Sequence, residues 1–302
     1  MKYVTRDHVS YVFWNGLSPV LEVEPGEQFI LETEDALSGR VRSEADAQPE
    51  AMARFNAERD AGRIGANPVT GPVFVRGAEP GDSLAVRIQA IELESPGVTR
   101  FRHGHAHAPL CYLFDEDKVK VTPVVDGQVV FNERIRIPIR PMVGTIGTAP
   151  MMEALASGRA GIHGGNMDVP DIAPGATVLL PVCHPGALLF AGDVHAVMGD
   201  AEICNTAIEI RSRVTLSARV HKGRPRSMMW PRVETPDAIM TVASGTPLDQ
   251  TLQAAFRDLI LWMEEDYGWD RAEAYLLATQ VADGRLCSNL AVRAIMPKKY
   301  LG

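Results

Sequence analysis

The chain has 302 residues, of which 46% are hydrophobic, and its formal net charge is -8. This composition indicates a globular protein with enough apolar residues for one large domain or two closely joined ones. The acidic balance and the scattered basic residues exclude a nucleic-acid partner, because affinity for polyanions depends on clustered Lys and Arg.

The first two thirds of the chain show short runs of strand character separated by Pro-Gly turns. In one of them Leu84, Val86 and Ile88 alternate with more polar neighbours, which is typical of a half-buried strand. The strands expected in chain order are 28–33, 72–75, 84–91, 177–182 and 214–220. Residues 43–62, rich in Ala, Glu and Arg, form an exception and favour a short surface helix.

Helical periodicity dominates only after residue 240. Thr246 and Pro247 offer an N-cap and a first helical residue, and an apolar stripe from Leu252 to Met263 follows. A second helix is expected over 270–280 and an extended segment over 291–297. The sequence therefore predicts a mainly β fold, a sandwich or barrel, in one unit over 1–302. Within it, the helix-containing residues 241–302 pack on the β-rich residues 1–240.

The four cysteines (Cys111, Cys183, Cys204 and Cys287) are far apart and form no CxxC pair. This spacing favours reduced thiols over a disulfide framework. The N-terminal residues lack an apolar signal segment, and no run approaches 18 consecutive apolar residues. We therefore expect a cytoplasmic protein with no membrane partner.

The densest group of candidate functional residues lies between His163 and Glu202, where acidic and histidine side chains alternate with glycines. Asp193 and His195 are two residues apart, so in an extended strand both side chains would point to one face and reach one ion. With Asp168 they supply the carboxylate and imidazole donors that suit a divalent metal such as zinc, and His163 is a reserve ligand. The alternative is that these residues cap turns and satisfy buried backbone groups.

Five ordered motifs carry a family resemblance. They are Asn67-Pro-Val-Thr70-Gly71-Pro72, Gly77-Ala-Glu79-Pro-Gly-Asp82, Gly147-Thr-Ala-Pro150, His163-Gly-Gly-Asn166-Met-Asp168 and Gly192-Asp193-Val-His195-Ala-Val-Met-Gly199-Asp200-Ala-Glu202. With them the chain resembles the acetamidase/formamidase family over essentially its whole length. The resemblance implies hydrolysis of short aliphatic amides to ammonia and a carboxylic acid, on a mainly β fold with a jelly-roll-like sandwich, in a homo-oligomer of two or more subunits.

Amide hydrolysis needs an activated nucleophile, a polarised carbonyl and a proton donor for the leaving nitrogen. We expect Asp168, Asp193 and His195 to hold a divalent metal that activates water. Glu202 is the expected general base and then the proton donor, and Asn166 the expected hydrogen-bond donor to the substrate oxygen. Asn67 is a weaker candidate for a supporting role.

The chain departs from the family pattern at His103, His105 and His107, where relatives more often carry a glycine-rich loop. Histidines at this spacing face one side of a strand and can bind zinc. They form either a second metal centre or the lining of a pocket that selects another amide. The exact substrate therefore stays open.

Other functions also stay open. Cys204 could act as a covalent nucleophile, but the apolar alternation over 203–208 favours a buried strand in which Cys204 is a small core residue. The substrate could be a larger or cyclic amide. The chain could also be a catalytically silent β-rich binding or assembly protein, in which case it would bind a ligand and release no ammonia.

Overall fold

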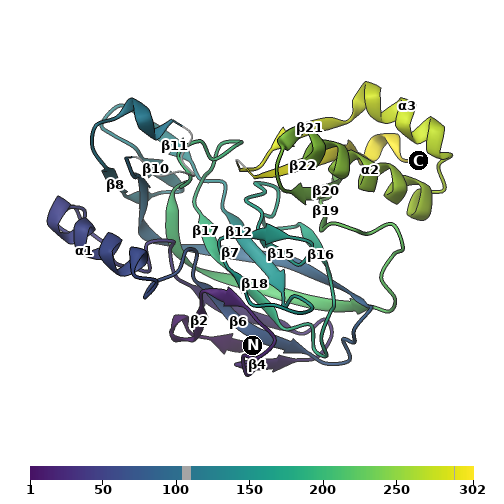
Figure 1. The fold of residues 1–302 in the computed structure, drawn as a ribbon, viewed down its shortest axis with the longest axis horizontal. Coiled ribbons are helices and arrows are strands. Elements are labelled where there is room, and N and C mark those ends of the chain that lie inside the picture. The colour runs from purple at the N-terminus through teal and green to yellow at the C-terminus, as the bar shows by residue number, and fades with distance from the viewer. Residues whose placement is uncertain (104–109, 289) are drawn as a thin grey trace.

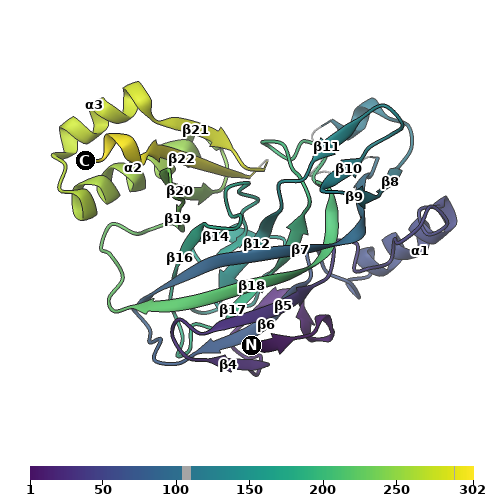
Figure 2. The ribbon, with the colours of Figure 1, turned by 180° about the vertical axis from the view of Figure 1, so that it is seen from behind.

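The structure is a computed structural model that describes residues 1–103, 110–288 and 290–302. Most of the described strands belong to one large, mainly antiparallel sheet that curls into a half-barrel (Figure 1, Figure 2). The predicted mainly β fold class is confirmed, and 17 of the described strands are joined in this one hydrogen-bonded sheet. Its strands are β1 (Lys2–Val4), β2 (Val9–Ser10), β4 (Leu21–Val23), β5 (Gln28–Thr33), β6 (Val69–Val75), β7 (Ser83–Phe101), β8 (Lys118–Thr122), β12 (Met142–Thr148), β14 (Ala160–Gly161), β15 (Gly164–Asn166), β16 (Thr177–Pro181), β17 (Leu189–His195), β18 (Glu209–His221), β19 (Arg232–Glu234), β20 (Ala238–Ser244), β21 (Asp283–Leu286) and β22 (Ala291–Pro297).

Two long strands organise the centre of this sheet. β18 pairs antiparallel with β5 on one side and with β7 on the other, and β17 pairs with β12 and β6. The alternation predicted for β7 is present, since Leu84, Val86 and Ile88 are fully buried, and the strand continues to Phe101. These side chains join one large apolar core, which makes a rigid support for the residues at the strand ends.

Small elements flank the sheet. Two short sheets are formed by β9 (Val124–Val125), β10 (Gln128–Val130) and β11 (Arg136–Pro138), and by β3 (Val12–Phe13) with β13 (Leu155–Ala156). Helix α1 (Pro49–Asp60) is the predicted surface helix and projects from the side of the sheet (Figure 1). It buries Met52 and Phe55 in a small apolar cluster of its own with Leu37 and Val98.

The C-terminal region adds helices to the same sheet. β19 pairs with β16 and with β20, so hydrogen bonding continues from the β-rich region into the helical one. Helix α2 (Leu248–Tyr267) buries its apolar stripe on β20 and β22, with α3 (Arg271–Val281) beside it (Figure 2). Among the described residues, no helix combines the length and apolar character needed to cross a membrane.

The helix ends follow from local chemistry. α2 begins at Leu248, one residue later than predicted, because Pro247 still has an extended backbone (ψ 157°) and serves as the N-cap position. It ends at Gly268, whose φ of 69° gives the left-handed conformation that glycine adopts without strain. The Asp270 carboxylate accepts the backbone N–H groups of Ala272 and Glu273 and starts α3.

Candidate metal centre and active site

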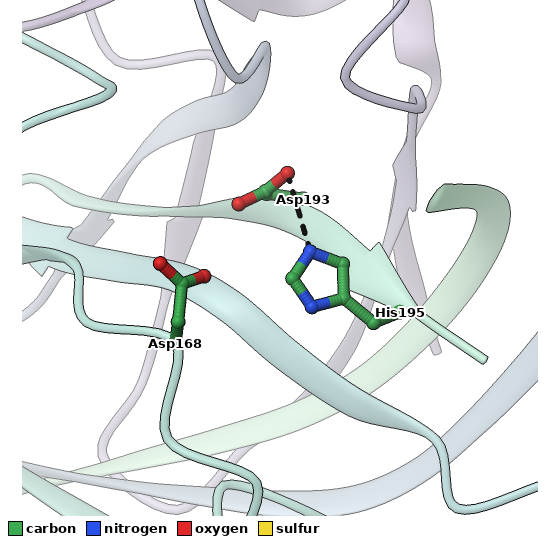
Figure 3. A group of neighbouring side chains, drawn as sticks. All are labelled: Asp168, Asp193 and His195. Carbon is green, nitrogen blue, oxygen red and sulfur yellow. Dashed lines mark ion pairs between the residues drawn. The ribbon is translucent and has the colours of Figure 1, made fainter. Parts of the chain in front are cut away.

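Five buried side chains converge where β17 and β18 meet. Asp168 follows β15, Asp193 and His195 lie on β17, Glu202 lies in the turn after β17, and Glu209 is the first residue of β18. Ligand atoms of Asp168, Asp193 and His195 lie within 4.8 Å of one another, as do those of His195, Glu202 and Glu209. Figure 3 shows the first three side chains directed toward one another. The structure therefore brings four of the predicted residues together and adds Glu209.

The backbone is unusual at the three acidic positions that sequence analysis identified. Asp168, Asp193 and Glu202 have φ values of 50°, 57° and 44°, a left-handed region that residues other than glycine seldom adopt. Asp193 is thus not in the extended conformation that the sequence argument assumed, although it does lie beside His195. Gly144 faces this point, and a Cβ there would lie 2.8 Å from oxygens of Asp168 and Asp193. A glycine is needed for the two carboxylates to approach.

Hydrogen bonds fix the orientation of Asp193. Its Oδ2 accepts the side-chain N–H of Asn67 and the hydroxyl of Thr145, both at 2.9 Å. The Thr145 oxygen also lies 2.9 Å from Asn166 Oδ1, so its single proton is shared between two acceptors. The other Asp193 oxygen, Oδ1, lies 3.6 Å from His195 Nε2.

Glu209 lies close to the same edge of the imidazole. Its Oε1 accepts the backbone N–H of Ala207 at 2.8 Å, and its Oε2 lies 3.3 Å from His195 Nε2. The carboxylates of Asp193 and Glu209 therefore both lie close to the same ring nitrogen. They flank this nitrogen from two neighbouring strands.

The donor set fits a divalent cation. Within the described residues of the chain, both oxygens of Asp168, both ring nitrogens of His195 and Glu209 Oε2 are buried without a hydrogen-bond partner. Buried polar atoms normally have hydrogen-bond partners, so this group of unpartnered oxygen and nitrogen atoms calls for an explanation. Carboxylate and imidazole atoms at this spacing are the usual ligands of zinc and similar ions.

The pKa shifts of the clustered side chains also favour a bound cation. Burial, and then the charge of Asp193, raise the pKa of Asp168 well above its ordinary value. Burial, and then the charge of Asp168, do the same to the pKa of Glu202. Burial alone would lower the pKa of His195, but the carboxylates of Glu209 and Asp193 outweigh it and hold that pKa well above the ordinary value. The site carries an excess of negative charge that a cation would neutralise.

Of the other predicted histidines, the two that the structure describes, His103 and His163, are not members of this cluster. His163 belongs to neither group of ligand atoms, and its buried ring packs edge-on against Phe13 with 5.0 Å between ring centroids. Burial lowers the pKa of His163 to about 4. His103 is exposed, and its backbone N–H donates to Asp117. His105 and His107 lie outside the described residues, so the histidine loop stays a prediction.

A cleft of about 840 Å³ opens beside the cluster, with Asn166, Asp193, Glu202 and Glu209 among its lining residues. Cys204 also lines it, so the prediction of a small core residue is wrong. Cys204 lies in a turn, half-buried, because the chain does not become a strand until Glu209, and neighbouring Ile203 is 57% exposed. Its Sγ lies 3.2 Å from the Thr206 carbonyl oxygen.

The C-terminal region of the sheet braces the cluster. Arg293 on β22 has a buried side chain whose Nε lies 2.9 Å from Asp171 Oδ2 and whose guanidinium donates to Asp200 Oδ1 at 2.8 Å. Asp171 follows Asp168 by three residues, and Asp200 precedes Glu202 by two. One arginine therefore ties together the two loops that present these acidic residues.

Sequence reasoning missed Glu209 and Thr145. A signal for Glu209 existed, since it interrupts an apolar run between Ile208 and Ile210. Thr145 carries no comparable signal, because threonine is ordinary in a strand.

Known proteins are similar to this chain in both sequence and fold. The model of the acetamidase/formamidase family matches residues 5–162 and 156–296. The crystal structure of an acetamidase from Bacillus halodurans is 31% identical with a TM-score of 0.90, covering 99% of this chain and 98% of that one. An acetamidase structure from Yersinia enterocolitica is 33% identical with a TM-score of 0.88, covering 100% and 93%.

Curated relatives are more distant and longer. An acetamidase of Mycolicibacterium smegmatis is 25% identical over 264 residues, which is 67% of this chain. The chain spans 63% of the length of that protein, and the same share of a relative from Schizosaccharomyces pombe.

Proposed function

Because this chain belongs to the acetamidase/formamidase family, we propose that it is an amidase that cleaves the carbon–nitrogen bond of short aliphatic carboxamides and releases ammonia and a carboxylic acid. The observation that carries the proposal is the buried cluster of four carboxylates around His195, three of which line the cleft. Attack of water on an amide needs a polarised carbonyl, a proton acceptor and a proton donor. The cluster can supply these roles.

We assign Asp168, Asp193 and His195 as ligands of a divalent cation, which their mixed oxygen and nitrogen donors suit, zinc above all. When bound, such an ion polarises a carbonyl and lowers the pKa of water. Thr145 and Asn67 orient Asp193 through its Oδ2, and Glu209 orients the His195 ring.

The remaining roles belong to residues on the cleft wall. Glu202 is the candidate to take the proton from water and deliver it to the leaving nitrogen. Asn166 lines the cleft, and its Oδ1 lies within hydrogen-bond distance of the Thr145 hydroxyl. This contact turns the Asn166 NH₂ group away from Thr145 and makes it available to donate to the substrate carbonyl.

The test combines metal analysis with ammonia release from formamide, acetamide and propionamide. Asp193→Ala should lose bound metal and lower turnover by more than about 100-fold, because removal of a supporting residue alone costs 10–100-fold. Asp249→Ala, an exposed control in the first turn of α2, should change neither. Retention of metal and turnover by Asp193→Ala would contradict the assignment.

A Cys204 nucleophile is the second candidate mechanism, and the position of Cys204 on the cleft wall is the observation that favours it. If the purified protein binds amides and releases no ammonia, it is a catalytically silent binding protein instead. A homo-oligomeric assembly and a cytoplasmic location stay predictions, and light scattering of the purified protein measures the first.

A further inference from the structure

The cleft has a basic wall as well as an acidic one. Besides the acidic residues of the cluster it is lined by four arginines, namely Arg59 from α1, Arg100 near the end of β7, Arg102 just after β7 and Arg159 just before β14. Its volume of about 840 Å³ lies in the range of sites that hold drug-sized ligands. An amide of one or two carbons would fill only a fraction of it and has no anionic group for the guanidinium groups to bind.

Only some of this basic charge is balanced within the protein. Arg102 pairs with both oxygens of Asp60, at 2.9 and 2.7 Å. Arg100 donates to the neutral side chain of Asn56 at 3.1 Å. Arg59 has no carboxylate within 4.0 Å among the residues that the structure describes. Within the described part of the chain, Arg59 and Arg100 therefore line the cleft without a directly paired carboxylate, as does the exposed Arg159.

An aromatic ring positions the guanidinium groups of Arg59 and Arg100. Arg59 and Arg100 lie 5.7 and 5.2 Å from the centroid of the Phe55 ring, which is itself buried under α1. Cation–π contacts of this kind hold a guanidinium in place while its N–H groups stay free to donate.

The positive charges of Arg59, Arg100 and Arg102 lie close enough together to lower the pKa values of Arg59 and Arg100. Burial, and then the charges of Arg59 and Arg102, lower the pKa of Arg100 to about 10. The pKa of Arg59 is lowered by burial and by Arg102, while Tyr11, Asp60 and then Asp193 oppose that shift. Arg59 therefore lies within electrostatic reach of a candidate metal ligand.

We propose that Arg59 and Arg100, with Arg102 beside them, form a carboxylate-binding subsite, so that the preferred substrates are linear amides that carry a carboxylate at the end opposite the amide. The proposal rests on the amidase function proposed above. The amide carbon would lie at the cluster, and the guanidinium groups would hold the carboxylate in the paired geometry that arginine offers to carboxylates.

The test compares succinamate with butanamide, which has the same four-carbon chain without the carboxylate. The readout is the ratio of kcat/KM for the two amides. We expect the ratio to favour succinamate in the native protein and to fall by about 10-fold or more in Arg59→Gln, as expected for loss of a charged hydrogen bond. Arg59→Lys should retain some of the preference. Arg54→Gln, an exposed arginine on the same helix that does not line the cleft, should leave the ratio unchanged.

Calorimetric binding of succinate separates this proposal from the amidase function. If neither amide releases ammonia but Arg59→Gln weakens succinate binding by about 10-fold relative to Arg54→Gln, the subsite stands and the amidase function fails. If both amides are hydrolysed and the ratio is the same in Arg59→Gln and Arg54→Gln, the subsite is refuted. Equal succinate affinity in the two variants also refutes it. An unchanged ratio with a lowered unfolding temperature would assign Arg59 to packing of α1 instead.

Discussion

Substitution of Thr145 by Val tests whether the orientation of Asp193 matters for metal binding. The change keeps the shape of a fully buried side chain and removes the hydroxyl 2.9 Å from Asp193 Oδ2. A hydrogen bond to a charged acceptor contributes about 1.5–3 kcal/mol. Loss of a group that orients a metal ligand costs about 10–100-fold in metal affinity, or about 1.4–2.8 kcal/mol. We therefore expect zinc affinity and turnover to fall within that range.

Thr148→Val is the matched control. Thr148 lies on the same strand, is equally buried, and donates to the Pro181 carbonyl oxygen at 2.7 Å, away from the cluster. It should lose about 1 kcal/mol of stability, typical of a neutral hydrogen bond, and keep its metal affinity. Calorimetric titration of zinc into both metal-free variants, with urea unfolding alongside, gives the comparison. Equal zinc affinities in the two variants would refute the reasoning.

Three further predictions follow from the site. In the folded protein the pKa of His163 is about 4, whereas in the unfolded chain it is about 6.5. Between these pH values the unfolded chain therefore binds a proton at His163 that the folded protein does not bind. The native protein should accordingly lose up to about 3 kcal/mol of stability as the pH falls from 6.5 to 4. His163→Gln should flatten that loss in urea titrations and leave metal content unchanged; loss of metal would instead make His163 a ligand. Cys204→Ser should keep metal and most of the turnover, whereas inactivity with metal retained would support a thiol nucleophile. Arg293→Met should lower the free energy of unfolding by about 2–3 kcal/mol, which is less than for a fully buried ion pair because Asp200 is 43% exposed. It should also lower turnover. Normal turnover would show that the loops of Asp171 and Asp200 keep their positions without Arg293.

Much of the β-rich body and of the cluster could be predicted because the relevant signals are local. Alternation of Leu84, Val86 and Ile88 follows directly from the two-residue period of a strand. Asp168, Asp193 and His195 stand out because carboxylate and imidazole groups are concentrated among glycines within one short stretch. The structure brings these three together, and their role as ligands stays a prediction.

The rest depends on pairing between distant segments. Glu209 reaches His195 because these two residues are paired directly across β17 and β18, and no local pattern reveals that register. Asp193 has a left-handed backbone, so the two-residue spacing predicts correctly that it lies near His195, although the ideal strand geometry behind that prediction is absent. Cys204 was misplaced because apolar residues alternate in its turn as they would in a strand.

Helix α1 contributes to one wall of the cleft and packs apart from the acidic cluster. The helix packs in its own small apolar cluster at the side of the sheet, separate from the large core that supports the acidic residues. Substitutions along α1 can therefore alter one wall of the cleft while the cluster keeps its geometry and the main core its stability. A selection for new amide specificity would accordingly concentrate its library on α1, where binding can be varied independently of bond cleavage.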